Sequence, residues 1–220
     1  TSLKGSDDET LAFLGSIRDV SARIEHENAL EAHNDALRAF HDITTDDSQS
    51  VAERTDAVLE LGCEYLELDI GILSAIDGNE YTAEQVVAPD EAIRSGELFD
   101  LSATFCELVV DSDQLVAETN ASRSELADHP AYDVQGLESY IGTPVVVDGE
   151  RYGTLNFSQP VARQRPFTAG ERTVVRIFAQ WIGKELSQQR NKRRATANRD
   201  RLRQIIDLLP QLVFAKDRDN

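Results

Sequence analysis

Two cysteines and a histidine–proline pair are the residues in this sequence most suited to chemistry. Cys106 lies in the run ATFCELVV (residues 103–110), and Asp128, His129 and Pro130 follow about twenty residues later. A cysteine with a lowered pKa can attach a chromophore or react with an oxidant, and a neighbouring histidine could activate it. The alternatives are a small buried side chain at Cys106 and a solvated loop histidine at His129. Cys63 is expected to be structural, and we predict no catalytic residue and no metal site.

The remaining histidines include a pair spaced by one heptad. His26 and His33 alternate with Leu30, Leu37 and Phe40 in a helical pattern that runs from about residue 20 to 43. Such a pattern predicts a short coiled-coil seam, which polar residues weaken while they fix its register. The histidines could form a pH switch at a dimer interface, or they could be half-exposed and neutralised by nearby glutamates. No two histidines show convincing metal-ligand spacing.

A basic run stands out in an acidic chain. The chain holds 40 acidic residues against 22 Lys and Arg, for a net charge of −18. Residues 184–203 nevertheless carry eight cations against two anions. Such a run could contact nucleic acid or a membrane surface, or it could be a solvated linker helix. Because no aromatic residues interleave it to stack on bases, we favour the linker and expect no nucleic-acid partner.

Composition also bears on habitat and compartment. Lysine occurs only four times among the 22 cations, and this scarcity with high acidity is typical of salt-loving archaea. No apolar run reaches the roughly 18 residues of a transmembrane helix, so we expect no membrane insertion and a cytoplasmic location. The chain begins at Thr1 and contains no methionine, and we therefore expect a piece of a longer protein.

Helix and hairpin signals alternate along the middle of the chain. Apolar spacing predicts a helix over about 50–66. Two hairpins are predicted, each joined through an Asp-Gly pair, which accepts the positive φ of a tight turn. The first joins residues 70–76 to 81–88 through Asp77-Gly78, and the second joins 139–147 to 151–158 through Asp148-Gly149. The insert between them predicts a short helix at 103–110, a strand at 114–119 and helical turns over 122–136.

The last helix begins at a capping box. Thr168 and Glu171 have the spacing that satisfies reciprocal backbone N–H groups. An apolar stripe then runs to Leu186, fades, resumes at Leu202 and ends at Pro210, after which residues 212–215 form a β-like run. Long helices at both ends of a compact body favour an in-line signalling module, because such helices can transmit a shift along the molecule.

Four stretches together resemble a GAF domain: residues 71–90, 104–110, 142–160 and 166–186. The flanks resemble PAS domains. Residues 13–31 are similar to a last PAS strand and its exit coil, and Asp19-Val20-Ser21-Ala22-Arg23 matches the Asp-(aliphatic)-Thr/Ser-x-Arg/Lys signal-transfer motif of that family. Residues 199–220 are similar to an entry helix and first strand. The resemblance implies a PAS–GAF–PAS segment of a sensor histidine kinase from a halophilic archaeon.

The resemblance also implies an architecture. We expect an α+β fold, with a GAF-like antiparallel sheet of five or six strands and long N- and C-terminal helices packed on one face. The predicted organisation, from the N-terminus, is a PAS remnant with the start of its exit coil (1–24), a coiled-coil linker helix (25–45), a GAF domain (46–186), a second linker helix (187–209) and the start of a second PAS domain (210–220).

The expected role is that of a non-catalytic sensory and dimerisation module, whose state biases the packing of the terminal helices. An unidentified small molecule is a possible ligand, and no cofactor is predicted. The predicted pocket residues are Phe105, Cys106, Tyr132, Tyr140, Gly142, Thr154 and Asn156. The predicted dimer and signalling contacts are Leu30, Leu37, Phe40, Ile177, Trp181 and Leu186. The partners would be a second copy and the adjacent PAS and output domains of the same chain.

Two other functions stay open at this point. A thiol-dependent reductase of the same fold would use Cys106, although its relatives use several cysteines. A haem or chromophore sensor would bind its cofactor in the insert, although bilin-binding relatives follow their cysteine with histidine, and here Glu107 follows Cys106. The Asn-Lys…Phe…Asp-Glu signature of cyclic-nucleotide GAF domains is absent, which lowers the case for a cyclic nucleotide.

Overall fold

The computed structural model describes residues 27–89 and 93–215, with side chains as far as residue 205. Several expectations fall outside these residues: the PAS-like run before residue 24, the motif from Asp19 to Arg23, and His26. The end of the expected second PAS segment, residues 216–220, lies outside them as well.

A single antiparallel sheet forms the centre of the molecule. Its six strands follow the spatial order β3-β2-β1-β6-β5-β4, and every neighbouring pair is antiparallel. The strands are β1 (Ile70–Asp77), β2 (Glu80–Val87), β3 (Glu97–Asp100), β4 (Val116–Glu118), β5 (Ser139–Val147) and β6 (Glu150–Gln159). The fold is therefore α+β, with the strand number and pairing that were expected.

Both hairpins are present, but their turns differ in one respect. In the second hairpin Asp148 and Gly149 are the two loop residues, both with positive φ, as predicted. In the first, Asp77 still pairs with Glu80, so the loop residues are Gly78 and Asn79 rather than Asp77 and Gly78. Only Gly78 of these two has a positive φ. A turn with its positive φ at the first loop position needs glycine there, which explains the shift of one residue.

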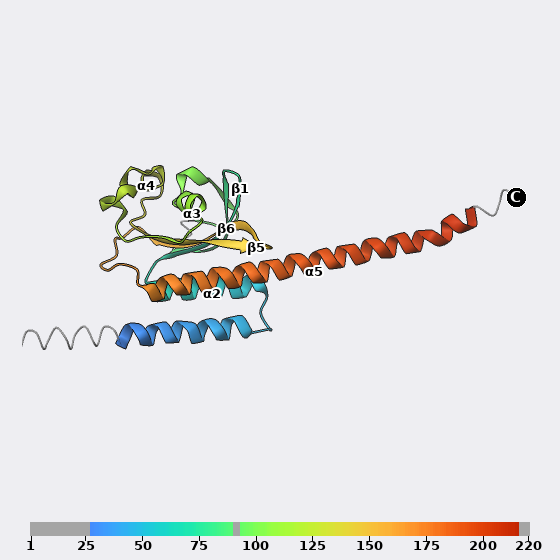
Figure 1. The fold of residues 1–220 in the computed structure, drawn as a ribbon, viewed down its shortest axis with the longest axis horizontal. Coiled ribbons are helices and arrows are strands. Elements are labelled where there is room, and N and C mark those ends of the chain that lie inside the picture. Colours follow the sequence, from blue (N-terminus) through green and yellow to red (C-terminus); the bar gives the residue numbers. More distant parts are fainter. Residues whose placement is uncertain (1–26, 90–92, 216–220) are drawn as a thin grey trace, which may run out of the picture.

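Three helices lie on one side of the sheet (Figure 1). Helix α2 (Val51–Leu66) and the first part of α5 (Ala169–Ala215) cover the sheet, and the helix over residues 27–45 lies against them as a further layer. The resemblance implied that the two long terminal helices would pack on one face. Both terminal helices do lie on that side, where α2 and α5 contact the sheet and the N-terminal helix packs outside them.

Helices α2 and α5 both begin at capping boxes. Ser50 accepts a hydrogen bond from the Glu53 N–H while Glu53 accepts one from the Ser50 N–H, and Thr168 and Glu171 make the same exchange. These caps satisfy N–H groups that a helix start leaves without partners. The predicted starts of both helices are confirmed.

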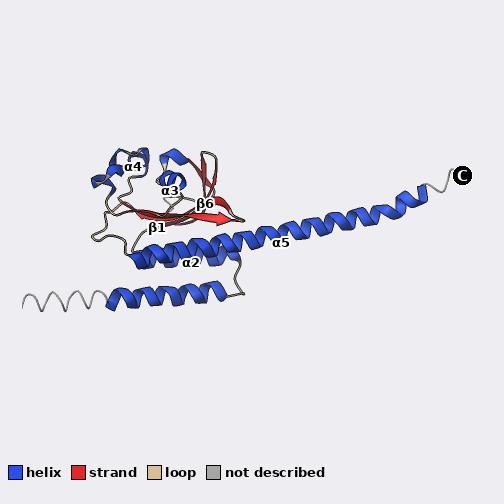
Figure 2. Ribbon diagram, in the orientation of Figure 1, coloured by secondary structure: helices blue, strands red, loops and turns tan. Residues whose placement is uncertain are grey.

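The insert covers the opposite side of the sheet (Figure 2). It contains α3 (Cys106–Ser112), α4 (Pro130–Gln135) and short 3₁₀ turns at 101–103, 121–123 and 125–128. The expected helix, strand and helical turns of this region are therefore confirmed, with α3 beginning three residues later than predicted.

Alternating residues of the strands feed two separate cores. On β1, Leu73 belongs to the core under the helices, while Ile70 and Ile72 belong to the core under the insert. On β6, Leu155 and Phe157 point to the helices, whereas Asn156 reaches the insert side. A sheet buried on both faces needs this alternation, and strand periodicity supplies it.

Helix α5 is one continuous helix well beyond the body. Residues 191–205 are all exposed, and this part projects away from the other described elements (Figure 1). The β-like run expected at residues 212–215 is wrong, because the helix continues through Pro210 to Ala215. Alternation over four residues is too short a signal to outweigh the helix that precedes it.

Candidate functional site

A buried cysteine is the centre of the insert-side core. Cys106 is the first residue of α3, and its side chain is almost fully buried. Three donors converge on its Sγ: Thr154 Oγ1 at 3.2 Å, and Tyr140 Oη and Asn156 Nδ2, both at 3.4 Å. Four residues from α3, β5 and β6 thus form one polar cluster, which we call the Cys106 cluster.

Two strands extend this cluster. Asn156 Nδ2 also donates to Tyr81 Oη of β2, at 3.2 Å. The Thr154 and Ser74 hydroxyls are 2.8 Å apart, which brings β1 into the same network. All of these side chains are buried. Buried polar groups require such partners, because an unpaired one keeps its full desolvation cost.

The cluster favours a neutral thiol. Burial raises the pKa of Cys106, although hydrogen bonds from Thr154 and Tyr140 oppose that rise. Burial likewise raises the pKa of both Tyr81 and Tyr140 well above the ordinary value. Since the thiolate is the reactive form of cysteine, Cys106 lacks the lowered pKa of a catalytic nucleophile.

Close packing leaves little room beside the cluster. The internal cavity next to Cys106 has a volume of about 20 Å³. That space is enough for one water molecule and much too small for a metabolite. Gly142 contributes to this tightness, because a Cβ there would lie 2.2 Å from Tyr140 Oη. The cavity is lined by Ile72, Tyr81, Ile93, Phe99, Thr104, Phe105, Cys106, Gln135, Leu137, Tyr140, Asn156 and Ser158.

The structure brings most of the predicted pocket residues together. Phe105, Cys106, Tyr140 and Asn156 line the cavity. Thr154 and Gly142 do not line the cavity, but they contact Cys106 and Tyr140, which do. Tyr132 packs against the same insert-side core but does not line the cavity, and its hydroxyl donates to Glu138 Oε1 at 2.8 Å.

His129 is engaged elsewhere than at Cys106. Its Nδ1 accepts from the Ala131 N–H at 3.1 Å and so caps α4, while its Nε2 lies 3.2 Å from Glu107 Oε2. Both ring nitrogens are therefore in use, and the ring packs against Phe105 instead. The Cys106–His129 catalytic pair considered from the sequence is not supported by this arrangement.

A second set of contacts joins the three helices on the other side of the sheet. Arg54 of α2 donates to the Thr44 carbonyl oxygen and pairs with Glu185 of α5, both at 3.0 Å. The Arg54 guanidinium also lies over the Trp181 ring, with its Cζ 5.6 Å from the ring centroid. Arg54 therefore links the end of the N-terminal helix to α2 and α5, and we call this set the helix junction.

Aromatic packing strengthens the helix junction. Phe40 of the N-terminal helix stacks on Phe178 with centroids 4.8 Å apart and meets Trp181 edge-on at 6.0 Å. Leu37 and Leu186 pack against the same core. Four of the six residues predicted for a dimer interface thus make contacts within one subunit, while Leu30 is 55% exposed. His33 likewise meets Tyr65 of α2, with Nδ1 3.1 Å from the hydroxyl.

The start of α5 is held by a buried ion pair. Glu171 Oε1 lies 2.7 Å from Arg163 Nη2 and 3.0 Å from Arg165 Nη1. Burial works against the charged carboxylate, but hydrogen bonds from Arg163 and the Thr168 N–H, with both arginine charges, hold the pKa of Glu171 below its ordinary value. Glu171 therefore stays ionised at neutral pH.

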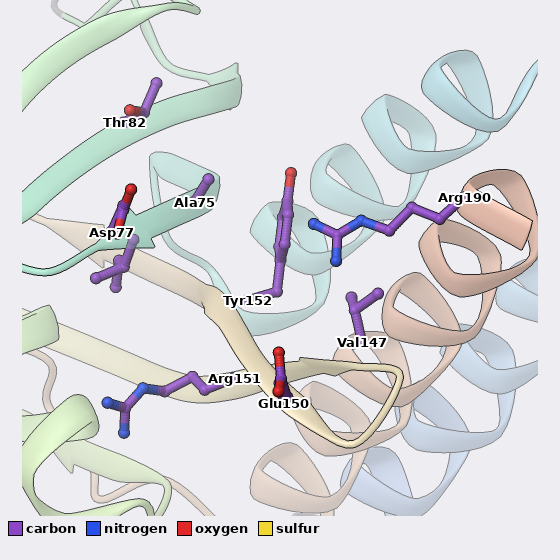
Figure 3. Close-up of a pocket in the computed structure, with 9 residues that line it drawn as sticks. Ala75, Asp77, Thr82, Val147, Glu150, Arg151, Tyr152 and Arg190 are labelled. Atoms are coloured by element: carbon purple, nitrogen blue, oxygen red, sulfur yellow. The ribbon is translucent and has the colours of Figure 1, made fainter. Parts of the chain in front are cut away.

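The β5–β6 hairpin also packs closely against α5 where the helix extends beyond the sheet. A Cβ at Gly183 would lie 2.3 Å from the Val146 carbonyl oxygen, so only glycine permits this approach. Beyond it, the Ser187 hydroxyl donates to the Asp148 carboxylate, and Arg194 lies 3.7 Å from the same group. The Arg190 guanidinium stacks on Tyr152 with its Cζ 4.9 Å from the ring centroid (Figure 3).

An open groove lies beside that stack. It has a volume of about 310 Å³ and separates Tyr152 from the end of the first hairpin (Figure 3). Tyr152 is fixed by its hydroxyl, which donates to Glu84 Oε2 at 2.5 Å. The groove is lined by Ala75, Ile76, Asp77, Thr82, Val147, Glu150, Arg151, Tyr152 and Arg190.

A family model for the GAF domain matches residues 50–186. The chain belongs to the GAF domain family. The match begins at Ser50, the N-cap of α2, and ends at Leu186, just before α5 leaves the body. It therefore includes both the Cys106 cluster and most of the helix junction. A comparison with curated protein sequences finds no match.

Solved structures share this fold at low sequence identity. The GAF domain of a phosphoenolpyruvate-protein phosphotransferase from Coxiella burnetii is 17% identical, with a TM-score of 0.58 over 76% of this chain and 96% of that one. Free methionine-R-sulfoxide reductase from Neisseria meningitidis, solved with its substrate, is 13% identical, with a TM-score of 0.57 over 71% and 90%. The blue-light-absorbing PixJ GAF domain from Thermosynechococcus elongatus is 17% identical, with a TM-score of 0.55 over 67% and 91%. At this identity the likeness shows the fold alone.

The described residues contain neither a cluster of potential metal ligands nor a membrane-spanning helix. No three His, Cys, Asp or Glu residues among the described ones lie close enough together to hold a metal ion. No described helix combines the length and hydropathy needed to span a bilayer.

Sequence reasoning missed several residues that build these sites. Tyr81 and Ser74 complete the Cys106 cluster, and Arg54 anchors the helix junction. Strand alternation could have found Ser74 as a polar residue on the same face as Ile70 and Ile72. No local signal marks Arg54, because its partners are 10 and 131 residues away in the chain.

Proposed function

We propose that this GAF domain is a non-catalytic sensory, signal-transmitting and dimerisation module of a multidomain sensor. On this proposal it is part of a cytoplasmic histidine kinase from a halophilic archaeon, between two PAS domains. A small molecule bound on the insert side, or the state of the upstream PAS domain, changes how the terminal helices pack. The module forms a homodimer through those helices.

One observation carries this proposal: β1 and β6 connect the Cys106 cluster directly to the helix-side core. On β6, Thr154 and Asn156 contact Cys106 while Leu155 and Phe157, between and beyond them, pack under the helices. On β1, Ser74 contacts Thr154 while its neighbour Leu73 faces the helices. Because packed side chains do not deform continuously, a displacement of these strands on one side is felt on the other.

The small volume of the cavity determines what a bound ligand would have to move. A ligand larger than water must displace part of the insert, because the space beside Cys106 is about 20 Å³. Ile93, Phe99 and Leu137 line that space from the insert and the edge strand. Binding would therefore shift the domain between two arrangements, and it would act only through its different affinity for each.

The enzymatic alternative is less well supported. A reductase using Cys106 would need a reactive thiolate, whereas burial raises the pKa of this thiol and His129 is engaged with Ala131 and Glu107. A bilin chromophore is less well supported because Glu107, and not a histidine, follows Cys106. We therefore propose no catalytic role for this segment and no cofactor.

The test is native mass spectrometry of the 220-residue chain in volatile salt, combined with an absorption spectrum. We expect a colourless protein with a dimer peak, and a bound mass that is lost in the Asn156→Leu variant if the ligand contacts the cluster. A visible chromophore band would overturn the proposal in favour of a pigment sensor. Turnover of a sulfoxide that Cys106→Ser abolishes would overturn it in favour of a reductase.

A further inference from the structure

The His129 ring connects two helices of the insert. Its side chain is 13% exposed and packs on the Phe105 ring, with the ring centroids 5.6 Å apart. The Nδ1 atom accepts a hydrogen bond from the Ala131 N–H at 3.1 Å and so caps α4. The Nε2 atom lies 3.2 Å from Oε2 of Glu107, in the first turn of α3. The contact between α3 and the start of α4 therefore depends on one imidazole.

These two contacts assign the proton of the neutral ring. Because Nδ1 accepts from a backbone N–H, it must carry a free lone pair, and the ring hydrogen is then on Nε2 and donates to Glu107. A second proton can enter only at Nδ1. The resulting Nδ1–H would face the Ala131 N–H, so the imidazolium form cannot cap α4. Imidazole ordinarily gains this proton between about pH 5 and pH 8.

The groups around the ring favour different charge states. The Glu107 carboxylate of α3 favours the imidazolium. The other carboxylates on the elements next to the ring are Glu125 and Asp128 in the preceding 3₁₀ turn and Asp133 in the first turn of α4. The start of α4 favours the neutral ring, because loss of an N-cap costs about 0.5–2 kcal/mol. Protonation would therefore keep the Glu107 contact and weaken α4.

Helix α4 is short enough to depend on its cap. It contains only six residues, Pro130–Gln135, and a helix of this length is not stable without caps or tertiary contacts. Gln135 at its end and Leu137 just beyond it line the cavity beside Cys106. A loosened α4 would therefore make the space beside Cys106 more accessible.

We propose that His129 is a pH-sensitive switch of the insert: the neutral ring holds α4 closed over the Cys106 cluster, and protonation of Nδ1 releases the start of α4. The consequence for signalling rests on the proposed function, in which a ligand larger than water must displace part of the insert. Acidification would then lower the cost of admitting that ligand, so that the module responds to pH as well as to the ligand.

The test is amide hydrogen exchange of the full chain, followed residue by residue by NMR from about pH 8 to about pH 5.5. The reporters are the amides of Ala131, Tyr132 and Gly136, which donate hydrogen bonds at the two ends of α4. After correction for the intrinsic exchange rate at each pH, their protection should fall about fivefold on acidification, which corresponds to about 1 kcal/mol. Helix α2 is the internal control, because the Ser50 hydroxyl that caps it does not titrate. Constant protection in α4 would overturn the proposal.

Two substitutions of His129 separate its two nitrogens. His129→Asn keeps an acceptor close to the position of Nδ1, and Asn is among the best N-cap residues, so α4 should stay protected at both ends of the pH range. His129→Gln keeps a donor within reach of Glu107 but has no acceptor at the Nδ1 position, so α4 should be weakly protected throughout. If His129→Asn kept the pH dependence of the wild type, another group would be the switch and the proposal would be wrong.

Glu107→Gln tests the same switch without changing the histidine. This variant removes the carboxylate that favours the imidazolium, so the loss of protection in α4 should occur at a lower pH than in the wild type. An unchanged pH profile would also overturn the proposal, because the titrating group would then not be the one that contacts Glu107.

These outcomes are independent of those that test the proposed function. If α4 does not respond to pH, the switch is refuted, and the sensory proposal stands with another means of opening the insert. If a chromophore band or Cys106-dependent turnover refutes the sensory proposal, a pH response of α4 that His129→Asn abolishes would still establish the switch.

Discussion

The side chains buried on the two faces of the sheet differ in polarity. Under the helices the buried core is mostly apolar, from Val58 of α2 to Phe178 and Ile182 of α5, and its main polar feature is the buried Arg163–Glu171 pair at the start of α5. Under the insert, the strands present Tyr81, Tyr140 and Asn156 around a buried thiol. Apolar packing stabilises a fold without requiring particular bond directions. Buried hydrogen bonds require a particular geometry, and their donors and acceptors can bind a ligand instead of one another. On the proposed function, the helix side would transmit the signal and the insert side would recognise the ligand.

The strongest test of this contrast is to remove packing on the helix side. Phe178→Ala deletes a fully buried ring that also stacks on Phe40. We expect a loss of about 3–5 kcal/mol in the free energy of unfolding, measured by urea denaturation. The N-terminal helix should also exchange its amides faster. A loss below about 1 kcal/mol, well under the usual cost of deleting a buried ring, would mean that this face is not the main source of stability.

Removing the buried carboxylate should have the next largest effect. Glu171→Gln leaves Arg163 buried without its counter-charge, and we expect a loss of about 3 kcal/mol. Because the folded pKa of Glu171 is lowered, its contribution is present above about pH 4.5 and is lost as the pH falls through the folded value. Thermal melting as a function of pH checks this point.

In the Glu171→Gln variant the stability should therefore fall less steeply on acidification than in the wild type. Equal slopes in the two proteins would show that Glu171 titrates in the same way in the folded and unfolded states.

The helix junction offers a smaller and more local effect. Arg54→Leu keeps the apolar part of the side chain but removes the contacts with Thr44 and Glu185. We expect about 1–2 kcal/mol of destabilisation, because a partly exposed ion pair contributes less than a buried one. Hydrogen exchange should increase most in residues 27–45 and to a smaller extent in the insert, because coupling across the sheet acts in both directions. Gln85, which contacts α2 at Ala52 and Asp56, supplies the control variant Gln85→Leu.

A substitution in the Cys106 cluster should cost the least stability of the substitutions proposed here. Asn156→Leu replaces a buried amide with an apolar side chain of similar size but removes the donor to Tyr81 Oη and Cys106 Sγ, so we expect a loss of about 1 kcal/mol in the free energy of unfolding. Urea denaturation is again the measurement. A loss as large as that of Phe178→Ala would show that the Cys106 cluster is a structural element and would contradict its role in recognition.

Local patterns allowed the fold to be predicted, and long-range contacts limited what could be known of the site. Capping boxes and glycine turns specify α2, α5 and both hairpins within a few residues, because their partners are close in the chain. Alternation placed Thr154 and Asn156 on one face of β6, but it did not determine that this face reaches Cys106. The size of the cavity was not, because it depends on how Ile93, Phe99 and Leu137 close over the strands from distant parts of the insert.

The N-terminal helix shows the same limit from another direction. Its heptad pattern correctly marked Leu37 and Phe40 as residues in need of a partner. Sequence periodicity cannot tell whether that partner is a second copy or another helix of the same chain. Here Phe40 packs on Phe178 and Trp181, which are more than 130 residues away in the sequence.

The central claim is that the Cys106 cluster and the terminal helices are coupled through β1 and β6. Hydrogen exchange of the whole chain, compared between the wild type and Asn156→Leu, tests it most directly. Asn156 contacts Cys106 and Tyr81 on the insert side. We predict altered exchange in residues 27–45 and in α5 near Phe178 and Glu185, across the sheet from the substitution. A change confined to β1, β6 and α3 would contradict the claim.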